Sequence, residues 1–237
     1  MPKEYVINHF SRNSNTEFIK IVDLLNDPNT PPDVYVNSFC FLGYRLLEGK
    51  FTDSEFIFDK IKLVLKRVED IEDETAKYRW KSSVLMICIY LKINEKFDVD
   101  DITPLIESAC NLQFVIKWPR IIVNVLIANI LKIALAILKN DFVKANQTIN
   151  YTFDVYKTAI TNMQLNSHVS DSITGEIIES SKLITVCIFM GKLTDFKIQY
   201  DSIPWKVSEF VYKKMVPDDN LKYAYSSLCK ILPQLKY

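Results

Sequence analysis

The chain has 237 residues, which suits one large domain or two small ones and allows a sizeable core without disulfides or metals. Hydrophobic residues make up 49% and charged residues 24% of the chain, a balance that excludes wholesale disorder. Lys+Arg and Asp+Glu each number 29, so the net charge is zero, which argues against a protein that coats nucleic acid. Only four glycines are present, which excludes a Gly-rich phosphate loop, a dinucleotide fingerprint or a many-turned β-barrel.

The cysteines and the N-terminus indicate the compartment. The five cysteines are Cys40, Cys88, Cys110, Cys187 and Cys229. They lie far apart without a C-x-x-C pair, which predicts reduced core residues in the cytoplasm. Residues 1–10 lack the apolar stretch of a signal peptide, so we expect no secretion.

Residues 121–138 form the most apolar segment and are nearly long enough to span a bilayer. Asn124, Ala128, Lys132 and Ala136 recur every four residues, which places small or polar groups on one narrow stripe. Because a charged residue near the middle of a bilayer costs several kcal/mol, we expect a buried helix at the centre of a helical stack and no membrane span.

Apolar residues recur at spacings of three and four almost throughout the chain, which predicts an all-α fold. Seven predicted helices cover residues 14–26, 30–48, 53–68, 75–92, 104–112, 119–139 and 141–163. A further helix is expected to end near Met190, and three more to begin at Thr194, Pro204 and Asp219. Helix start and stop signals mark most of these bounds: Pro104 and Pro119, for example, are expected to open their helices. No convincing strand is present.

The boundary near residue 50 carries the clearest signals. Gly49 can take the left-handed conformation that ends a helix. Thr52 and Glu55 have the spacing of a capping box, and Phe51 and Phe56 the spacing of a hydrophobic staple. Together they predict that a new helix starts here.

The helices recur as hairpins. The stretch from Gly49 to Asp53 returns as the similar stretch from Gly191 to Asp195, an offset of three times about 47 residues, and turns at 94–97 and 139–142 fall between them. A period of this length predicts stacked helix hairpins, an α-solenoid, with an irregular helical bundle as the alternative. The layout resembles tetratricopeptide-like repeats, although the period is longer than 34 residues and small residues are scarce.

This interpretation predicts a single elongated domain over residues 1–237. Residues 1–26 would form an N-terminal cap, residues 30–203 the hairpin repeats, and residues 204–237 the C-terminal capping helices.

Two acidic clusters, at residues 69–74 and 98–101, are the candidates for metal chemistry. Carboxylates suit Mg²⁺, and all-helical diphosphate-processing enzymes place acidic pairs on facing helices. Asp70, Asp73, Asp100 and Asp101 are the candidate ligands. The simpler interpretation is that these acids lie at helix starts, where each offsets the helix dipole. Only two histidines are present, His9 and His168, and neither lies near a recognisable nucleophile motif.

Aromatic residues gather towards the end of the chain. Trp205, Tyr212, Tyr223, Tyr225 and Tyr237 alternate with lysines. This mixture could stack single-stranded nucleic acid, but acidic residues dilute the charge. Tyr and Trp are enriched at protein interfaces, so we expect a partner-binding surface for protein.

The sequence therefore predicts a non-enzymatic scaffold or adaptor that presents a long helical surface to other protein chains or to copies of itself. The first alternative is an oligomeric subunit of a phage or virus particle, such as a ring or connector. The second is an all-helical Mg²⁺-dependent hydrolase acting on a phosphorylated small molecule. No cofactor and no nucleic acid are expected, and the expected location is the cytoplasm, or a virus particle under the first alternative.

Overall fold

A computed structural model describes residues 15–95, 97–112, 119–166, 186 and 219–233. These residues hold eight α-helices and one short 3₁₀-helix, with no strand among them. The predicted all-α class is therefore confirmed. The contacts divide the chain into two compact units, Met1–Cys88 and Ile89–Tyr237, with the division inside α5. The single domain expected from the sequence stays a prediction.

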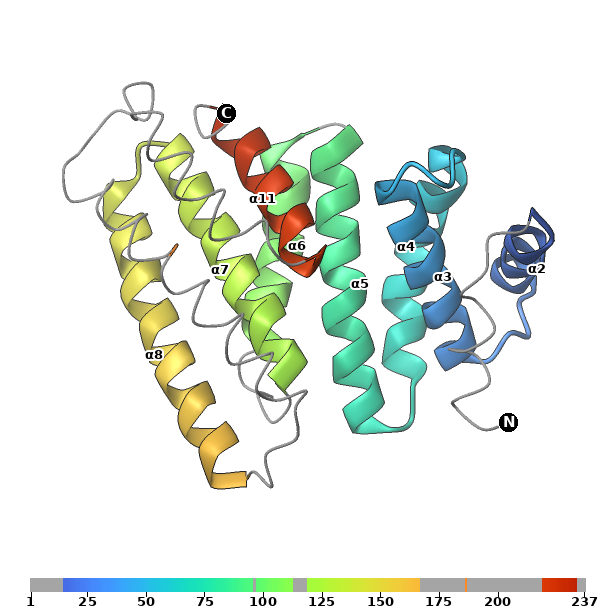
Figure 1. Ribbon diagram of the computed structural model, residues 1–237, viewed down its shortest axis with the longest axis horizontal. Helices are drawn as coiled ribbons and strands as arrows, with labels where there is room; N and C mark the ends of the chain where they lie inside the picture. The colour runs from blue at the N-terminus through green and yellow to red at the C-terminus, as the bar shows by residue number, and fades with distance from the viewer. Residues whose placement is uncertain (1–14, 96, 113–118, 167–185, 187–218, 234–237) are drawn as a thin grey trace. The chain divides into compact units, whose positions relative to one another are not determined.

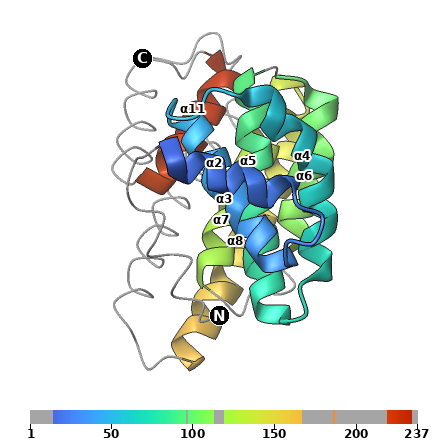
Figure 2. The ribbon, with the colours of Figure 1, turned by 90° about the vertical axis from the view of Figure 1, so that its right-hand side faces the viewer.

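The first unit is built from helices that pack against their neighbours in the chain. Its elements are α2 (Asn15–Asn26), α3 (Pro32–Leu47), α4 (Ser54–Arg67), the 3₁₀-helix η1 (Val68–Asp70) and the first part of α5 (Glu74–Glu95). α3 packs against α2, α4 and η1 (Figure 2). Its face towards the core carries Tyr35, Val36, Phe39 and Leu42, each at most 1% exposed. Burial of these apolar side chains is the main force that holds the unit together.

The second unit is organised around one apolar helix. It contains the end of α5, α6 (Val99–Asn111), α7 (Pro119–Leu138), α8 (Phe142–Asn166) and α11 (Asp219–Ile231). α7 packs against α6, α8 and α11, and Figure 1 shows α7 and α8 side by side. By length and composition residues Ile121–Leu138 could cross a membrane, but 83% of this stretch is buried within the fold. α7 is thus the buried helix expected from the sequence.

Two helices end with the same left-handed turn. Gly49 after α3 has a φ of 69°, and Asn140 after α7 has a φ of 56°. In each turn two backbone N–H groups return to carbonyls of the last helical turn: Gly49 N lies 3.0 Å from Leu46 O, and Asn140 N lies 2.9 Å from Ile137 O. The backbone N–H of the next residue bonds in each case to the carbonyl five residues earlier, which completes a Schellman motif. Gly49 therefore acts as predicted.

Four helices begin at an aspartate whose carboxylate accepts a backbone N–H of the first turn. These N-caps are Asp53, Asp73, Asp98 and Asp141. The cap at Asp141 agrees with the helix start predicted at residue 141. The capping box predicted at Thr52 is wrong, since Asp53 Oδ1 accepts the bond from Phe56 N at 3.0 Å. A carboxylate one residue closer to the helix takes the position, and Thr52 is left exposed.

The start predicted for α6 is also wrong. The helix begins at Val99, five residues before Pro104, and its N-cap Asp98 accepts a hydrogen bond from Asp100 N at 2.9 Å. A proline inside a helix removes one N–H and crowds the carbonyl four residues earlier. Here that carbonyl belongs to Asp100, and both Asp100 and Pro104 are exposed, so water can satisfy the freed group.

Most other helix bounds agree with the prediction. α2, α3, α4, α7 and α8 begin within two residues of their expected starts, and α11 begins at Asp219 as expected. The helices predicted to begin at Thr194 and Pro204, and the one predicted to end near Met190, lie outside the described residues.

Candidate functional site

An open groove with a volume of about 600 Å³ lies in the first unit. Its walls are the first turns of α3, the segment that joins η1 to α5, and the first turns of α5. Its polar lining consists of Asp33, Asn37, Asp70, Glu72, Asp73, Thr75 and Arg79. Its apolar lining includes Pro32, Val34, Ile71, Ala76 and Trp80. We call this feature the α3–α5 groove.

Local structure explains why acids line the groove. Val68 and Ile71 are buried, at 0% and 5% exposure, and anchor the segment between α4 and α5. The acidic side chains between and after these anchors remain at the surface. Asp73 ends the segment as the N-cap of α5, with its Oδ1 2.9 Å from Ala76 N. The chain therefore turns into α5 with three carboxylates, those of Asp70, Glu72 and Asp73, in the lining of the groove.

Contacts behind the groove hold its walls in place. Arg67 Nη2 donates to the carbonyl of Pro28 at 2.6 Å, and its guanidinium lies 5.6 Å from the centre of the Tyr35 ring. Burial raises the pKa of the Tyr35 hydroxyl, an effect that the nearby Arg67 charge partly opposes. Lys81 of α5 forms an ion pair with Glu69 of η1. These contacts join α4 to the loop before α3, and η1 to α5.

The predicted metal candidates fall into separate parts of the chain. Asp70 and Asp73 line the α3–α5 groove in the first unit. Asp100 and Asp101 lie in the first turn of α6 in the second unit, where Asp101 Oδ2 is 3.2 Å from Lys92 Nζ. Within the described part of the chain no three His, Cys, Asp or Glu side chains come together in a group that could hold a metal ion.

Two members of the predicted aromatic surface are described. Tyr223 and Tyr225 lie on α11 and are half-buried. The Tyr223 ring packs 5.9 Å from the ring of Tyr90 at the end of α5, and Lys230 donates to the carbonyl of Asn94 at 2.7 Å. At Tyr223 the aromatic side chain thus helps to fasten α11 to the last turns of α5. Trp205, Tyr212 and Tyr237, together with both histidines, lie outside the described residues.

The four described cysteines, Cys40, Cys88, Cys110 and Cys229, are buried, as the sequence predicted for core residues. Burial raises the pKa of the Cys110 thiol to about 12, partly opposed by the nearby Lys132 charge. Burial also raises the pKa of Cys40, and the neighbouring Cys88 adds to this effect. Because the thiolate is the reactive form of cysteine, these two side chains are suited to packing and not to nucleophilic chemistry.

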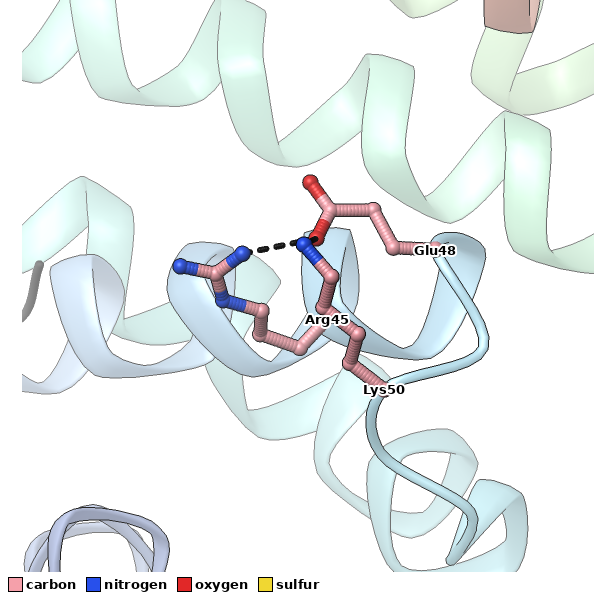
Figure 3. Close-up of polar contacts among 3 residues, drawn as sticks. All are labelled: Arg45, Glu48 and Lys50. Atoms are coloured by element: carbon pink, nitrogen blue, oxygen red, sulfur yellow. Dashed lines mark hydrogen bonds and ion pairs between the residues drawn. The ribbon is translucent and has the colours of Figure 1, made fainter. Parts of the chain in front are cut away.

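A charged cluster closes the turn between α3 and α4 (Figure 3). Glu48 Oε2 lies 2.7 Å from Arg45 Nη1 and 2.9 Å from Lys50 Nζ. Partial burial of Glu48 would by itself raise its pKa, but the hydrogen bonds and charges of Lys50 and Arg45 outweigh this and lower the pKa. Arg45 also lies 5.0 Å from the centre of the Phe41 ring, which packs against Phe18 of α2. Through Arg45 and Phe41 the cluster is connected to the aromatic contact between α2 and α3.

Comparison of the chain with protein-family models, with curated proteins and with solved structures gave no match. The α3–α5 groove is accordingly identified from geometry alone. Sequence reasoning found its acidic segment but missed Asp33, Arg79 and Trp80. The spacing of Asp73, Ala76 and Trp80 was a usable signal, because residues separated by three and four lie on one face of a helix.

Proposed function

We propose that this protein is a non-enzymatic scaffold that binds other protein chains through its helical surface. The observation that carries the proposal is the α3–α5 groove, an open depression lined by both apolar and charged side chains. Protein interfaces also combine apolar with polar residues, and tryptophan is among the residues that contribute most to binding. Trp80 is half-buried in the wall of the groove, so part of its indole is accessible to a partner.

We further propose that the scaffold is built from degenerate hairpin repeats. The first helices of three successive pairs, α3, α5 and α7, begin 42 and 45 residues apart. The second helices, α4, α6 and α8, begin 45 and 43 residues apart, and each has an aspartate N-cap. Nearly constant spacing and a shared cap support a common unit. The left-handed turns at Gly49 and Asn140 support it further.

Affinity capture followed by reconstitution tests the scaffold function. The tagged full-length chain is used to capture proteins from its native source, and each captured protein is then purified separately. We expect at least one of them to form a stoichiometric complex with the chain in size-exclusion chromatography with light scattering. If no purified candidate forms a complex, the scaffold proposal is wrong.

The same preparation separates the alternatives. A particle subunit would assemble into rings or larger oligomers of the chain alone, which light scattering detects as a multiple of 27.6 kDa. A hydrolase would release phosphate from phosphorylated small molecules in the presence of Mg²⁺, and an Asp70→Asn/Asp73→Asn variant would lose that activity. If either result is obtained and no complex can be reconstituted, the corresponding alternative replaces the scaffold proposal.

A further inference from the structure

We propose that the α3–α5 groove binds an arginine-bearing segment of a partner protein, with a guanidinium group placed against Trp80 and within reach of Asp70 and Glu72. The inference rests on the proposed scaffold function, because it takes the groove as the contact surface. It adds the chemistry of the partner, which the composition of the whole chain does not reveal, since the net charge of the chain is zero.

The charge of the groove favours a basic partner. Four carboxylates line it, those of Asp33, Asp70, Glu72 and Asp73, against the single guanidinium of Arg79. The N-termini of α3 and α5 also point to this region, and each helix start contributes about half a positive charge. The carboxylates still exceed the positive groups by about two charges.

Three of these carboxylates are available to a partner. Asp33, Asp70 and Glu72 are exposed, and within the described part of the chain they form no ion pair. The nearby Lys81 is already paired with Glu69. Asp73 has a structural role as the N-cap of α5. Of the three available carboxylates, Asp33 lies on α3, whereas Asp70 and Glu72 lie two residues apart on the segment that leads into α5, and we assign this pair to the ligand.

The apolar wall distinguishes arginine from other cations. A guanidinium group is planar and weakly hydrated, so it can stack on an indole while its edge donates two parallel hydrogen bonds to a carboxylate. A lysine ammonium is a compact, strongly hydrated charge that gains less from an apolar wall. Pro32, Val34, Ile71 and Trp80 supply that wall, next to the carboxylates. The groove volume of about 600 Å³ is within the usual range of ligand sites.

Peptide binding to the full-length protein tests this inference. The probe is a fluorescein-labelled twelve-residue peptide in which arginines alternate with leucine and serine, and binding is followed by fluorescence anisotropy. Two further peptides carry lysine or glutamate at every arginine position. We expect the arginine peptide to bind most tightly, the lysine peptide more weakly, and the glutamate peptide not at all.

A matched pair of variants locates the binding. The Asp70→Asn/Glu72→Gln variant removes two negative charges in the groove, whereas Asp59→Asn/Asp154→Asn removes two exposed negative charges outside it. We expect the groove variant to weaken binding of the arginine peptide about fivefold to tenfold and the control to leave it unchanged. A Trp80→Leu variant should remove the preference for arginine over lysine. Circular dichroism melts of every variant confirm that it is folded.

Equal weakening by the groove and control variants would overturn the inference, because it would mean that the peptide responds only to total charge. Absence of arginine-peptide binding would also overturn it, as would equal affinity for the arginine and lysine peptides. These failures are separable from failure of the scaffold function. If a reconstituted complex still forms, the scaffold function stands and the partner contacts the protein by other chemistry or at another surface.

Discussion

Replacing Gly49 with alanine measures the backbone energy of the turn between α3 and α4. Gly49 has a φ of 69°, and a Cβ atom added there would have no atom within 4 Å, so the substitution causes no collision. The left-handed conformation costs an L-residue about 1–2 kcal/mol. Alanine also reduces the conformational entropy of the unfolded chain, and this effect stabilises the folded state by about 0.4–1 kcal/mol. We therefore expect a net loss of about 1 kcal/mol in the free energy of unfolding.

Thermal unfolding followed by circular dichroism tests this value. For a chain of this length a loss of 1 kcal/mol lowers Tm by about 2–4 °C. The control is Gly49→Asn, because asparagine tolerates the left-handed region better than alanine does. Asn140→Gly at the corresponding turn after α7 should leave Tm almost unchanged, since φ is 56° there. If the Tm of Gly49→Ala equals that of the wild type, or exceeds that of Gly49→Asn, the assignment of a strained left-handed cap is wrong.

Three further predictions concern a cap, the core and a charge. Asp53→Ala should lower the free energy of unfolding by about 1 kcal/mol, whereas Thr52→Ala should change it by less than about 0.5 kcal/mol. Urea denaturation measures both values, and a larger loss of stability for Thr52→Ala than for Asp53→Ala would contradict the observed cap. Leu126 is fully buried on α7, so Leu126→Ala should lower the free energy of unfolding by about 2–5 kcal/mol in the same assay. Val143 is 70% exposed, so Val143→Ala should lower it by less than about 0.5 kcal/mol. The pKa of Glu48 is lowered by its partners from an ordinary value of 4.5, so Glu48→Gln should be less stable than wild type at pH 7 by up to about 1 kcal/mol. That difference should disappear as the pH falls below 4.5 through the folded pKa, and a difference that persists unchanged in acid would refute the charge cluster.

Local signals in the sequence were sufficient to place most helices. Gly49 and Asp141 act within a few residues of their own positions, and both were identified correctly as a helix end and a helix start. The errors came from competition between local signals. At α4, Asp53 takes the capping role in place of Thr52. At α6, the cap at Asp98 starts the helix before Pro104, and the exposed surface tolerates the backbone hydrogen bond that the proline removes.

The candidate site was only partly visible in the sequence. The acidic segment that contains Asp70 and Asp73 was conspicuous, but its partner wall comes from the start of α3, almost forty residues earlier in the chain. No local pattern connects Asp33 with Trp80. Similarly, the Tyr223 ring was predicted to meet a partner protein, and only the fold shows that it packs against Tyr90.

Capping bonds, proline and left-handed turns involve atoms within a few residues of one another, and for this reason the amino-acid sequence alone determined the helical class and the approximate bounds of its helices. The tertiary structure decided which faces are buried, that α11 packs against α7, and that four carboxylates line the same groove as Trp80. Those features arise from the burial of side chains that are far apart in the chain, so their energy depends on the arrangement of the helices and not on any local pattern.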